Sequence, residues 1–219
     1  MAMAALVTCN HPSLAQGNPA ATPPSQTATV TGTTSADASA SSSQSAAVPV
    51  PAPAIPQLAD VFVDGIELRN PDSSRVKLGS GLRYVTDDSL TLFTQYYNET
   101  GKEILKLYAG STVKTKRSFK GYDISKLDKA FLVGGIRRLR TTKRFVTGKG
   151  IFLGMNQHEI ETILGQPTQT ENESDGSTTV RYSLTDAASP FLQYYKSAEY
   201  TGAYKFKHCS LVEVQVAFK

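Results

Sequence analysis

Residues 154–167 read GMNQHEIETILGQP, and both ends of a short helix are marked within them. Asn156 can cap the first turn, and Glu159, three residues later, can complete a capping box. Apolar residues at helical spacing form one stripe: Ile160, Ile163 and Leu164. Gly165 suits the position after a helix, and the proline that follows prevents the helix from continuing. The sequence therefore predicts a helix over 156–164 that buries one face.

The sequence after this helix predicts antiparallel strands. Residues 178–184 alternate between apolar and polar side chains and follow the turn-rich segment 172–177. Residues 204–207 and 211–218 are typical of a closing hairpin with a turn near residues 208–210. Alternation in the last strand places one set of side chains on the face that we expect to be buried: Val212, Val214, Val216 and Phe218.

An earlier stretch, between residues 60 and 120, also predicts antiparallel β structure. Residues 89–97 and 103–108 are rich in β-forming side chains and are joined by a turn that ends in Gly101, so they predict a hairpin. Residues 61–68 predict a neighbouring strand region. Residues 72–74 read as a turn-prone link, and a further strand is expected from Val76 onward.

The chain divides into a part that can fold and a part that cannot. Residues 1–57 contain a single charged side chain, and residues 16–57 are dominated by Ala, Ser, Thr and Pro, which predicts a disordered tether. The remainder is long enough to bury a core without disulfide or metal staples. The expected fold class is α+β, with a β-rich antiparallel domain over 58–145 and a small helix-plus-antiparallel-sheet domain over 146–219. Whether the two share one sheet is left open.

The N-terminal residues predict export. Residues 1–15 are interpreted as a truncated signal segment, because residues 13–15 (Ser-Leu-Ala) carry small side chains at the positions that a signal peptidase reads. A competing interpretation is a lipobox over residues 6–9, in which Cys9 would be the lipidated residue. A disordered cytosolic N-terminus is the alternative to both. No apolar run approaches the roughly 20 residues of a membrane-spanning helix, so no transmembrane span is expected.

Positive charge is concentrated between Lys114 and Lys149. This run holds twelve Lys and Arg against two Asp, although the whole chain has a net charge of only +4. The asymmetry indicates a polyanion contact, for which there are seven candidate residues: Lys116, Arg117, Arg137, Arg138, Arg140, Lys143 and Arg144. For an exported protein the partner would be an anionic envelope polymer or lipid. Nucleic acid is not expected, because no binding motif accompanies the charge. A solvated strand face is the alternative.

Two histidines are candidates for catalysis or metal binding. His158-Glu159 begins an HExxH zinc motif, but position 162 is Thr. His208 and Cys209 are adjacent in sequence. A catalytic Cys-His pair needs the two side chains to converge, whereas neighbours on a strand point to opposite faces. If Cys9 is removed or acylated on export, Cys209 is the only thiol left and no internal disulfide is expected.

A second motif, that of serine acylation, is incomplete in this sequence. Ser111-x-x-Lys114 matches the motif of penicillin-binding proteins, but the chain lacks its S-D-N and K-T-G partners and places the residues on an expected strand. No phosphate-binding glycine loop is present either. The sequence therefore predicts no catalytic, cofactor-binding or metal site.

Local motifs in about the last 70 residues together resemble a known family. They are a helix entered by Gly-Met and left by Leu-Gly-x-Pro, a strand with Tyr, and a hairpin with Tyr-x-Phe followed by Leu-Val-x-Val. The residues are Gly154, Met155, Ile160, Ile163, Leu164, Gly165, Pro167, Tyr182, Phe206, Leu211 and Val214. This combination resembles the domain of BamE/SmpA-type outer-membrane lipoproteins and β-lactamase-inhibitor-like (BLIP-like) proteins. BamE-type domains have a further helix before the Gly-Met turn, whereas residues 131–147 look strand-like here.

The resemblance implies an envelope or secreted protein that acts by binding another protein and has no catalytic residues. We therefore expect a non-enzymatic, exported protein-binding module without cofactors, located in the periplasm, at the outer membrane or outside the cell. The alternative is an envelope surface-binding protein that uses the basic run against anionic polymers or lipids. An enzyme is the third reading, and it would need a pocket that gathers a histidine with carboxylates.

Overall fold

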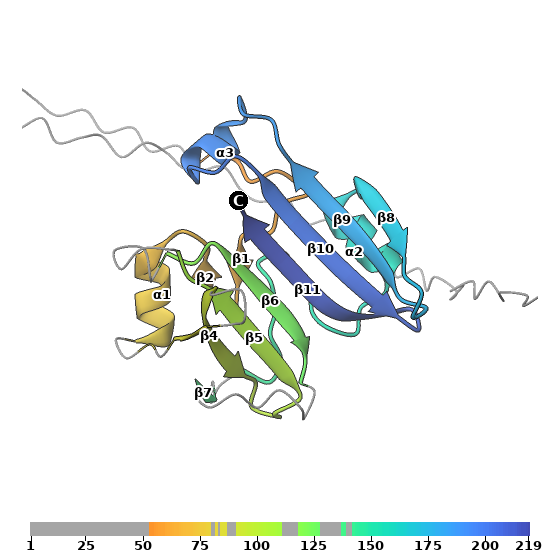
Figure 1. Ribbon diagram of the computed structural model, residues 1–219, viewed down its shortest axis with the longest axis horizontal. Coiled ribbons are helices and arrows are strands. Elements are labelled where there is room, and N and C mark those ends of the chain that lie inside the picture. The colour runs from red at the N-terminus through yellow and green to blue at the C-terminus, as the bar shows by residue number, and fades with distance from the viewer. Residues whose placement is uncertain are drawn as a thin grey trace, which may run out of the picture. The chain divides into compact units, whose positions relative to one another are not determined.

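The computed structural model describes residues 53–79, 82, 84–86, 91–110, 118–127, 137–138 and 142–219. Among these residues, a large antiparallel sheet lies beside a two-stranded sheet and three short helices (Figure 1). The strands of the large sheet follow the order β3 (Val85–Thr86), β4 (Leu92–Tyr97), β5 (Glu103–Tyr108), β6 (Gly121–Lys126), β11 (Ser210–Phe218), β10 (Tyr200–Lys207), β9 (Thr178–Leu184) and β8 (Gln169–Asn172). In addition, β7 (Arg137–Arg138) pairs in parallel with β4. The prediction of mainly antiparallel sheet with few helices is confirmed.

The two β-rich stretches of the sequence form one continuous sheet. β6 pairs with β11 along Glu213–Ala217, so strands from both stretches share one sheet and one core. Gly121 permits this close pairing, because a Cβ atom there would lie 2.5 Å from the backbone oxygen of Val216. The expected division into separate domains over 58–145 and 146–219 is therefore corrected. The physical reason is that β11 has a hydrogen-bonded partner along both of its edges.

The two predicted hairpins are confirmed as β4–β5 and β10–β11. The second begins earlier than expected, at Tyr200. Its turn is formed by His208 and Cys209, which have positive φ angles of 50° and 61°. Two such residues in succession match the right-handed twist of paired strands.

The buried face of β11 differs from simple alternation. Glu213 pairs with Lys205, but Leu211 pairs with Phe206, so Val212 is an extra residue in a β-bulge. Leu211 is consequently fully buried, whereas Val212 is only partly buried. The expectation that Val212 faces the core is wrong for this reason, while Val214 and the later alternate residues are buried as predicted.

The first described elements are a small hairpin and a helix. β1 (Phe62–Val63) and β2 (Ile66–Glu67) form the two-stranded sheet. α1 (Pro71–Leu78) follows, where the sequence predicted a turn and then a strand. The side-chain oxygen of Asn70 accepts hydrogen bonds from the N–H groups of Asp72 (3.0 Å) and Ser73 (3.2 Å). This N-cap, with proline at the first helical position, makes the segment helical.

α2 (Gln157–Leu164) confirms the predicted helix and its capping box. Asn156 Oδ1 accepts from the Glu159 N–H (3.0 Å), and the Glu159 carboxylate accepts from the Asn156 N–H (2.7 Å). The Tyr182 hydroxyl on β9 donates to the carbonyl of Gly165 (3.0 Å), which joins the end of α2 to the sheet. α3 (Pro190–Tyr194) lies in the link between β9 and β10 and was not predicted.

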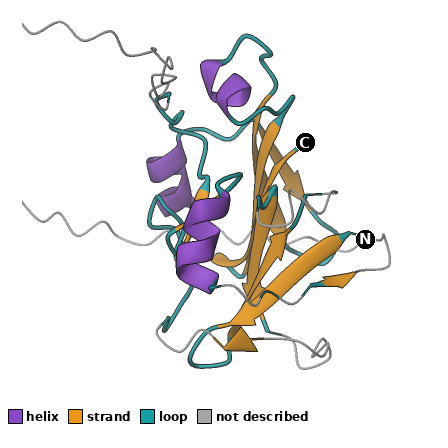
Figure 2. Ribbon diagram, turned by 90° about the vertical axis from the view of Figure 1, so that its left-hand side faces the viewer, coloured by secondary structure: helices purple, strands orange, loops and turns teal. Residues whose placement is uncertain are grey.

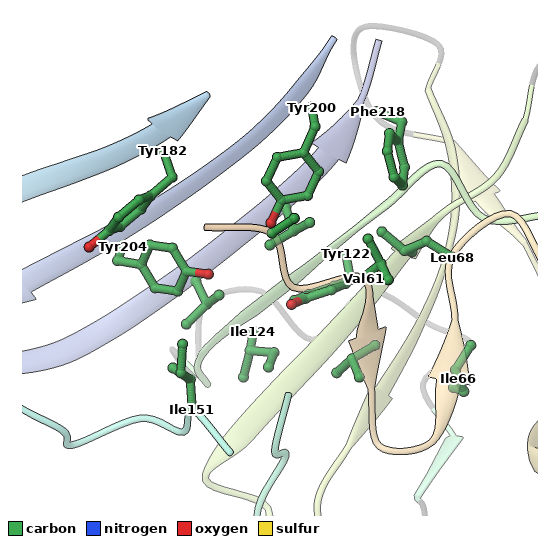
Figure 3. Packing of buried hydrophobic residues seen from close by; sticks show 14 of the residues in the cluster. Val61, Ile66, Leu68, Tyr122, Ile124, Ile151, Tyr182, Tyr200, Tyr204 and Phe218 are labelled. Atoms are coloured by element: carbon green, nitrogen blue, oxygen red, sulfur yellow. The ribbon is translucent and has the colours of Figure 1, made fainter. Parts of the chain in front are cut away.

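The helices lie on one side of the large sheet (Figure 2). The core between them and the sheet is dominated by large rings (Figure 3), among them Tyr122, Tyr182, Tyr200, Tyr204 and Phe218. All five rings are at most 2% exposed. Among the described residues, the opposite face of β8–β11 has no helix over it.

Candidate functional site

The face of β8–β11 that points away from the helices carries short and polar side chains. In β10 the buried residues Tyr200, Gly202 and Tyr204 alternate with partly exposed side chains, and β9 shows a related alternation. We call this surface the outer face. It is formed by Gln169, Thr179, Arg181, Ser183, Thr201, Ala203, Lys205, Glu213, Gln215 and Ala217.

Strand register arranges the outer face in rows that cross the sheet. Arg181, Ala203 and Gln215 lie opposite one another on β9, β10 and β11. Two neighbouring depressions, with volumes of about 190 and 420 Å³, both include these three residues in their lining. Ala203 therefore lies at the point that the two depressions share, and its small side chain leaves the surface open there.

Ion pairs hold the longer charged side chains of the outer face in place. Lys205 Nζ is 2.6 Å from Glu173 Oε2, and Arg181 Nη2 is 3.2 Å from Glu171 Oε2. Hydrogen bonds, first from Lys205 and then from Thr179, lower the pKa of Glu173, while the bond to Glu173 raises the pKa of Lys205. Such exposed pairs add little stability. Their effect here is to present ordered and largely neutralised polar groups.

Asp123 lies beside the outer face, on β6 opposite Gln215. It is 4% exposed, its nearest cation is Lys106 at 3.9 Å, and its Oδ1 atom has no hydrogen-bond partner among the described residues. Burial, followed by the negative charge of Glu213, raises the pKa of Asp123 to about 7. The charge next to the outer face therefore changes near neutral pH.

The hydroxyls of Tyr122, Tyr200 and Tyr204 point toward one another beneath the sheet (Figure 3), and all three interact with Asp60. The Asp60 N–H donates to the Tyr200 hydroxyl oxygen (2.7 Å), and the Tyr122 hydroxyl donates to the Asp60 carbonyl (3.2 Å). Burial raises the pKa of Tyr122, Tyr200 and Tyr204. Two of the hydroxyls bond to the Asp60 backbone, and all three rings are buried in the core. This cluster therefore holds the segment at Asp60 against the sheet.

Only part of the predicted polyanion contact is described. Cys9, Lys116, Arg117 and Arg140 lie outside the described residues, as do Ser111 and Lys114 of the acylation-like motif. The backbones of Arg137 and Arg138 form β7, beside Tyr96 and Tyr97 at the end of β4. Lys143 and Arg144 are exposed in the segment 142–145.

The fold brings other cations to the same end of the sheet. Lys102 lies in the β4–β5 turn and Lys126 at the end of β6, and both are exposed. The Leu127 N–H donates to the Lys102 carbonyl (2.9 Å), which connects these two positions. We call the group of Lys102, Lys126, Lys143 and Arg144 the basic end. Lys102 is outside the basic run of the sequence, and only the pairing of β4, β5 and β6 brings it here.

The histidines and Cys209 do not form a reactive group. His158 is exposed on α2, and His208 is exposed in the β10–β11 turn. Cys209, in the β10–β11 turn, is disulfide-bonded, which corrects the expectation of a free thiol. Within the described ranges, no set of three or more His, Cys, Asp or Glu side chains is placed to hold a metal ion.

Sequence reasoning did not identify the residues of the outer face. The available signal was the alternation in residues 200–206, where Tyr, Gly, Tyr and Phe occupy one face and Thr, Ala and Lys the other. Alternation gives the two faces of one strand, but the rows across strands depend on register, which local sequence does not specify.

Comparisons with protein-family models, curated proteins and solved structures gave no match. The resemblance to BamE/SmpA-type and BLIP-like domains therefore stays a prediction. None of the helices in the described part has the length and apolar character needed to cross a membrane.

Proposed function

We propose that this chain is an exported, non-enzymatic module that binds another protein through the outer face. The observation that carries the proposal is the pair of adjoining depressions across β8–β11, on a sheet whose other side is filled by a dense aromatic core. A sheet fixed in this way keeps its side chains in place before a partner arrives, which lowers the entropic cost of binding.

The lining of the depressions favours a protein over a small molecule. Small-molecule sites are mostly apolar and enclose their ligand. Here the lining is dominated by Thr, Ser, Gln, Glu, Lys and Arg side chains, as in Thr179, Gln215 and Arg181. Polar groups spread over several strands suit the direct and water-bridged hydrogen bonds of a protein interface.

The test uses a substitution at the centre of the outer face. Ala203→Arg places a long charged side chain where the two depressions meet. Val76→Arg is the control, because Val76 is 83% exposed on α1. We expect wild type and the control to capture the same protein from an extract of the source cells at low and high salt, and Ala203→Arg to lose it while keeping its unfolding temperature. Equal capture by all three proteins would contradict the use of this face.

Export is tested separately, by the mass of the intact mature chain in membrane and soluble fractions of the source cells. An acylated Cys9 in the membrane fraction, or a chain that begins at Gln16 in the soluble fraction, would support export. Either form would require Cys209 to make its disulfide with a second molecule, because the chain has two cysteines. A chain that retains Met1 in the cytosol would refute export.

A further inference from the structure

We infer that the basic end is a second binding surface, separate from the outer face, and that its ligand is a linear polymer of phosphate groups. The proposal rests on three features of the described residues: the way the fold assembles the four cations, the absence of ion pairs within 4.0 Å at these cations, and the placement of Arg144 on an aromatic ring.

A buried asparagine assembles this end of the sheet. Asn98 is 1% exposed, and its side-chain oxygen accepts from the N–H groups of Lys102 (3.0 Å) and Glu103 (3.2 Å). Its amide nitrogen donates to the Lys143 carbonyl (2.8 Å). The same side chain thus binds the backbone at two of the four cations and holds the segment 142–145 against the β4–β5 turn.

The cations of the basic end are unpaired within the described structure. The cations Lys106, Arg181, Lys205, Lys207 and Lys219 each lie within 4.0 Å of a carboxylate. No such pair involves any cation of the basic end in the described ranges. Three carboxylates belong to the neighbouring segments: Asp64 accepts from the Thr142 hydroxyl (2.9 Å), Glu103 accepts from the Phe145 N–H (2.8 Å), and Glu99 follows β4. Glu103 also interacts electrostatically with Arg144, but none of the three lies within 4.0 Å of a cation of the basic end in the described ranges.

Arg144 packs over an aromatic ring. Its guanidinium carbon lies 4.5 Å from the centroid of the Phe152 ring. Stacking on an aromatic face leaves the N–H groups at the guanidinium edge available for the oxygens of a phosphate. Together with Arg144, the exposed lysines of the β4–β5 turn, the end of β6 and the segment 142–145 can contact successive charges of a flexible chain.

Lipid and nucleic acid fit this surface less well. Binding to a membrane surface is strengthened when apolar side chains enter the headgroup region. The large apolar side chains that are exposed in the described structure are Ile55, Val76 and Tyr194, and none lies on the segments that carry the four cations. Single-stranded nucleic acid is bound with the help of exposed aromatic rings that stack on bases. At the basic end the nearby ring, Phe152, already lies under Arg144.

The experiment measures the affinity of the full chain for inorganic polyphosphate at several salt concentrations. The test variant is Lys102→Gln, Lys126→Gln, Lys143→Gln combined. The matched control is Lys205→Gln, Lys207→Gln, Lys219→Gln, which removes the same charge from ion-paired positions. We expect the test variant to bind roughly ten- to a hundredfold more weakly and with a shallower salt dependence, and the control to change little. Lys→Arg at the three test positions should retain binding.

Three results would overturn the inference. If the control variant binds polyphosphate as weakly as the test variant, the affinity depends only on the net charge of the protein. Tighter binding of single-stranded nucleic acid of equal charge would assign the surface to that ligand. Binding to vesicles of phosphatidylglycerol without binding to polyphosphate would assign it to a lipid surface.

Discussion

Tyr200 and Tyr204 lie on the same face of β10, but their hydroxyls have different surroundings. Tyr200 accepts from the Asp60 N–H at 2.7 Å, whereas Tyr204 Oη has no hydrogen-bond partner among the described residues. Removing the Tyr200 hydroxyl leaves the buried Asp60 N–H without an acceptor, which costs about 1–3 kcal/mol. Removing the Tyr204 hydroxyl breaks no hydrogen bond among the described residues. We expect Tyr200→Phe to lower the free energy of unfolding by that amount and Tyr204→Phe to leave it unchanged or raise it. Denaturant unfolding of both variants checks this, and a larger loss for Tyr204→Phe would contradict it.

Asp123 gives a pH-dependent prediction. Its pKa in the folded chain, about 7, is above its unfolded value, so the folded state binds more protons between these values and stability falls as pH rises through them. Asp123→Asn removes this loss. We expect the variant to be more stable than wild type at pH 8, with a gain that is smaller at pH 5 by roughly 2 kcal/mol. Urea unfolding at the two pH values measures the gain; the same gain at both would show that Asp123 titrates normally.

At the scale of single elements, α2 has the most direct test. Leu164 is 2% exposed and belongs to the core between the helices and the sheet. We expect Leu164→Ala to lower the free energy of unfolding by about 2–5 kcal/mol. His158→Ala, at an exposed position of the same helix, is the control and should change it little. A loss of less than about 1 kcal/mol for Leu164→Ala would mean that α2 does not pack as described.

Elements defined by local chemistry could be predicted, and elements defined by distant contacts could not. The capping box of α2 is made by Asn156 and Glu159 and is visible in the sequence. α1 also has a local signal, in Asn70 followed by proline, but the β-branched Val76 favoured a strand in the sequence. In the structure Val76 lies exposed on α1. The bulge at Val212 had no local signal, because it follows from the pairing of β11 with β10.

At the scale of the whole molecule, both surfaces depend on strand order. β11 pairs with β6 and β10, so the predicted pair of domains becomes one sheet. The outer face is built on β8–β11 and the basic end on β4, β5, β6 and the segment 142–145. The sequence predicts the charge of Lys143 and Arg144, but only the assembled sheet adds Lys102. For the same reason no residue of the outer face could be selected from sequence alone.

The most direct test of the proposed function is photo-crosslinking in the source cells. A photo-reactive amino acid is placed at Ala203, where the two depressions meet, and in a second protein at Val76 on α1. We predict that position 203 crosslinks to one dominant protein and that position 76 does not crosslink to that protein. The same partner crosslinked equally well from both positions, or only from position 76, would contradict binding through the outer face.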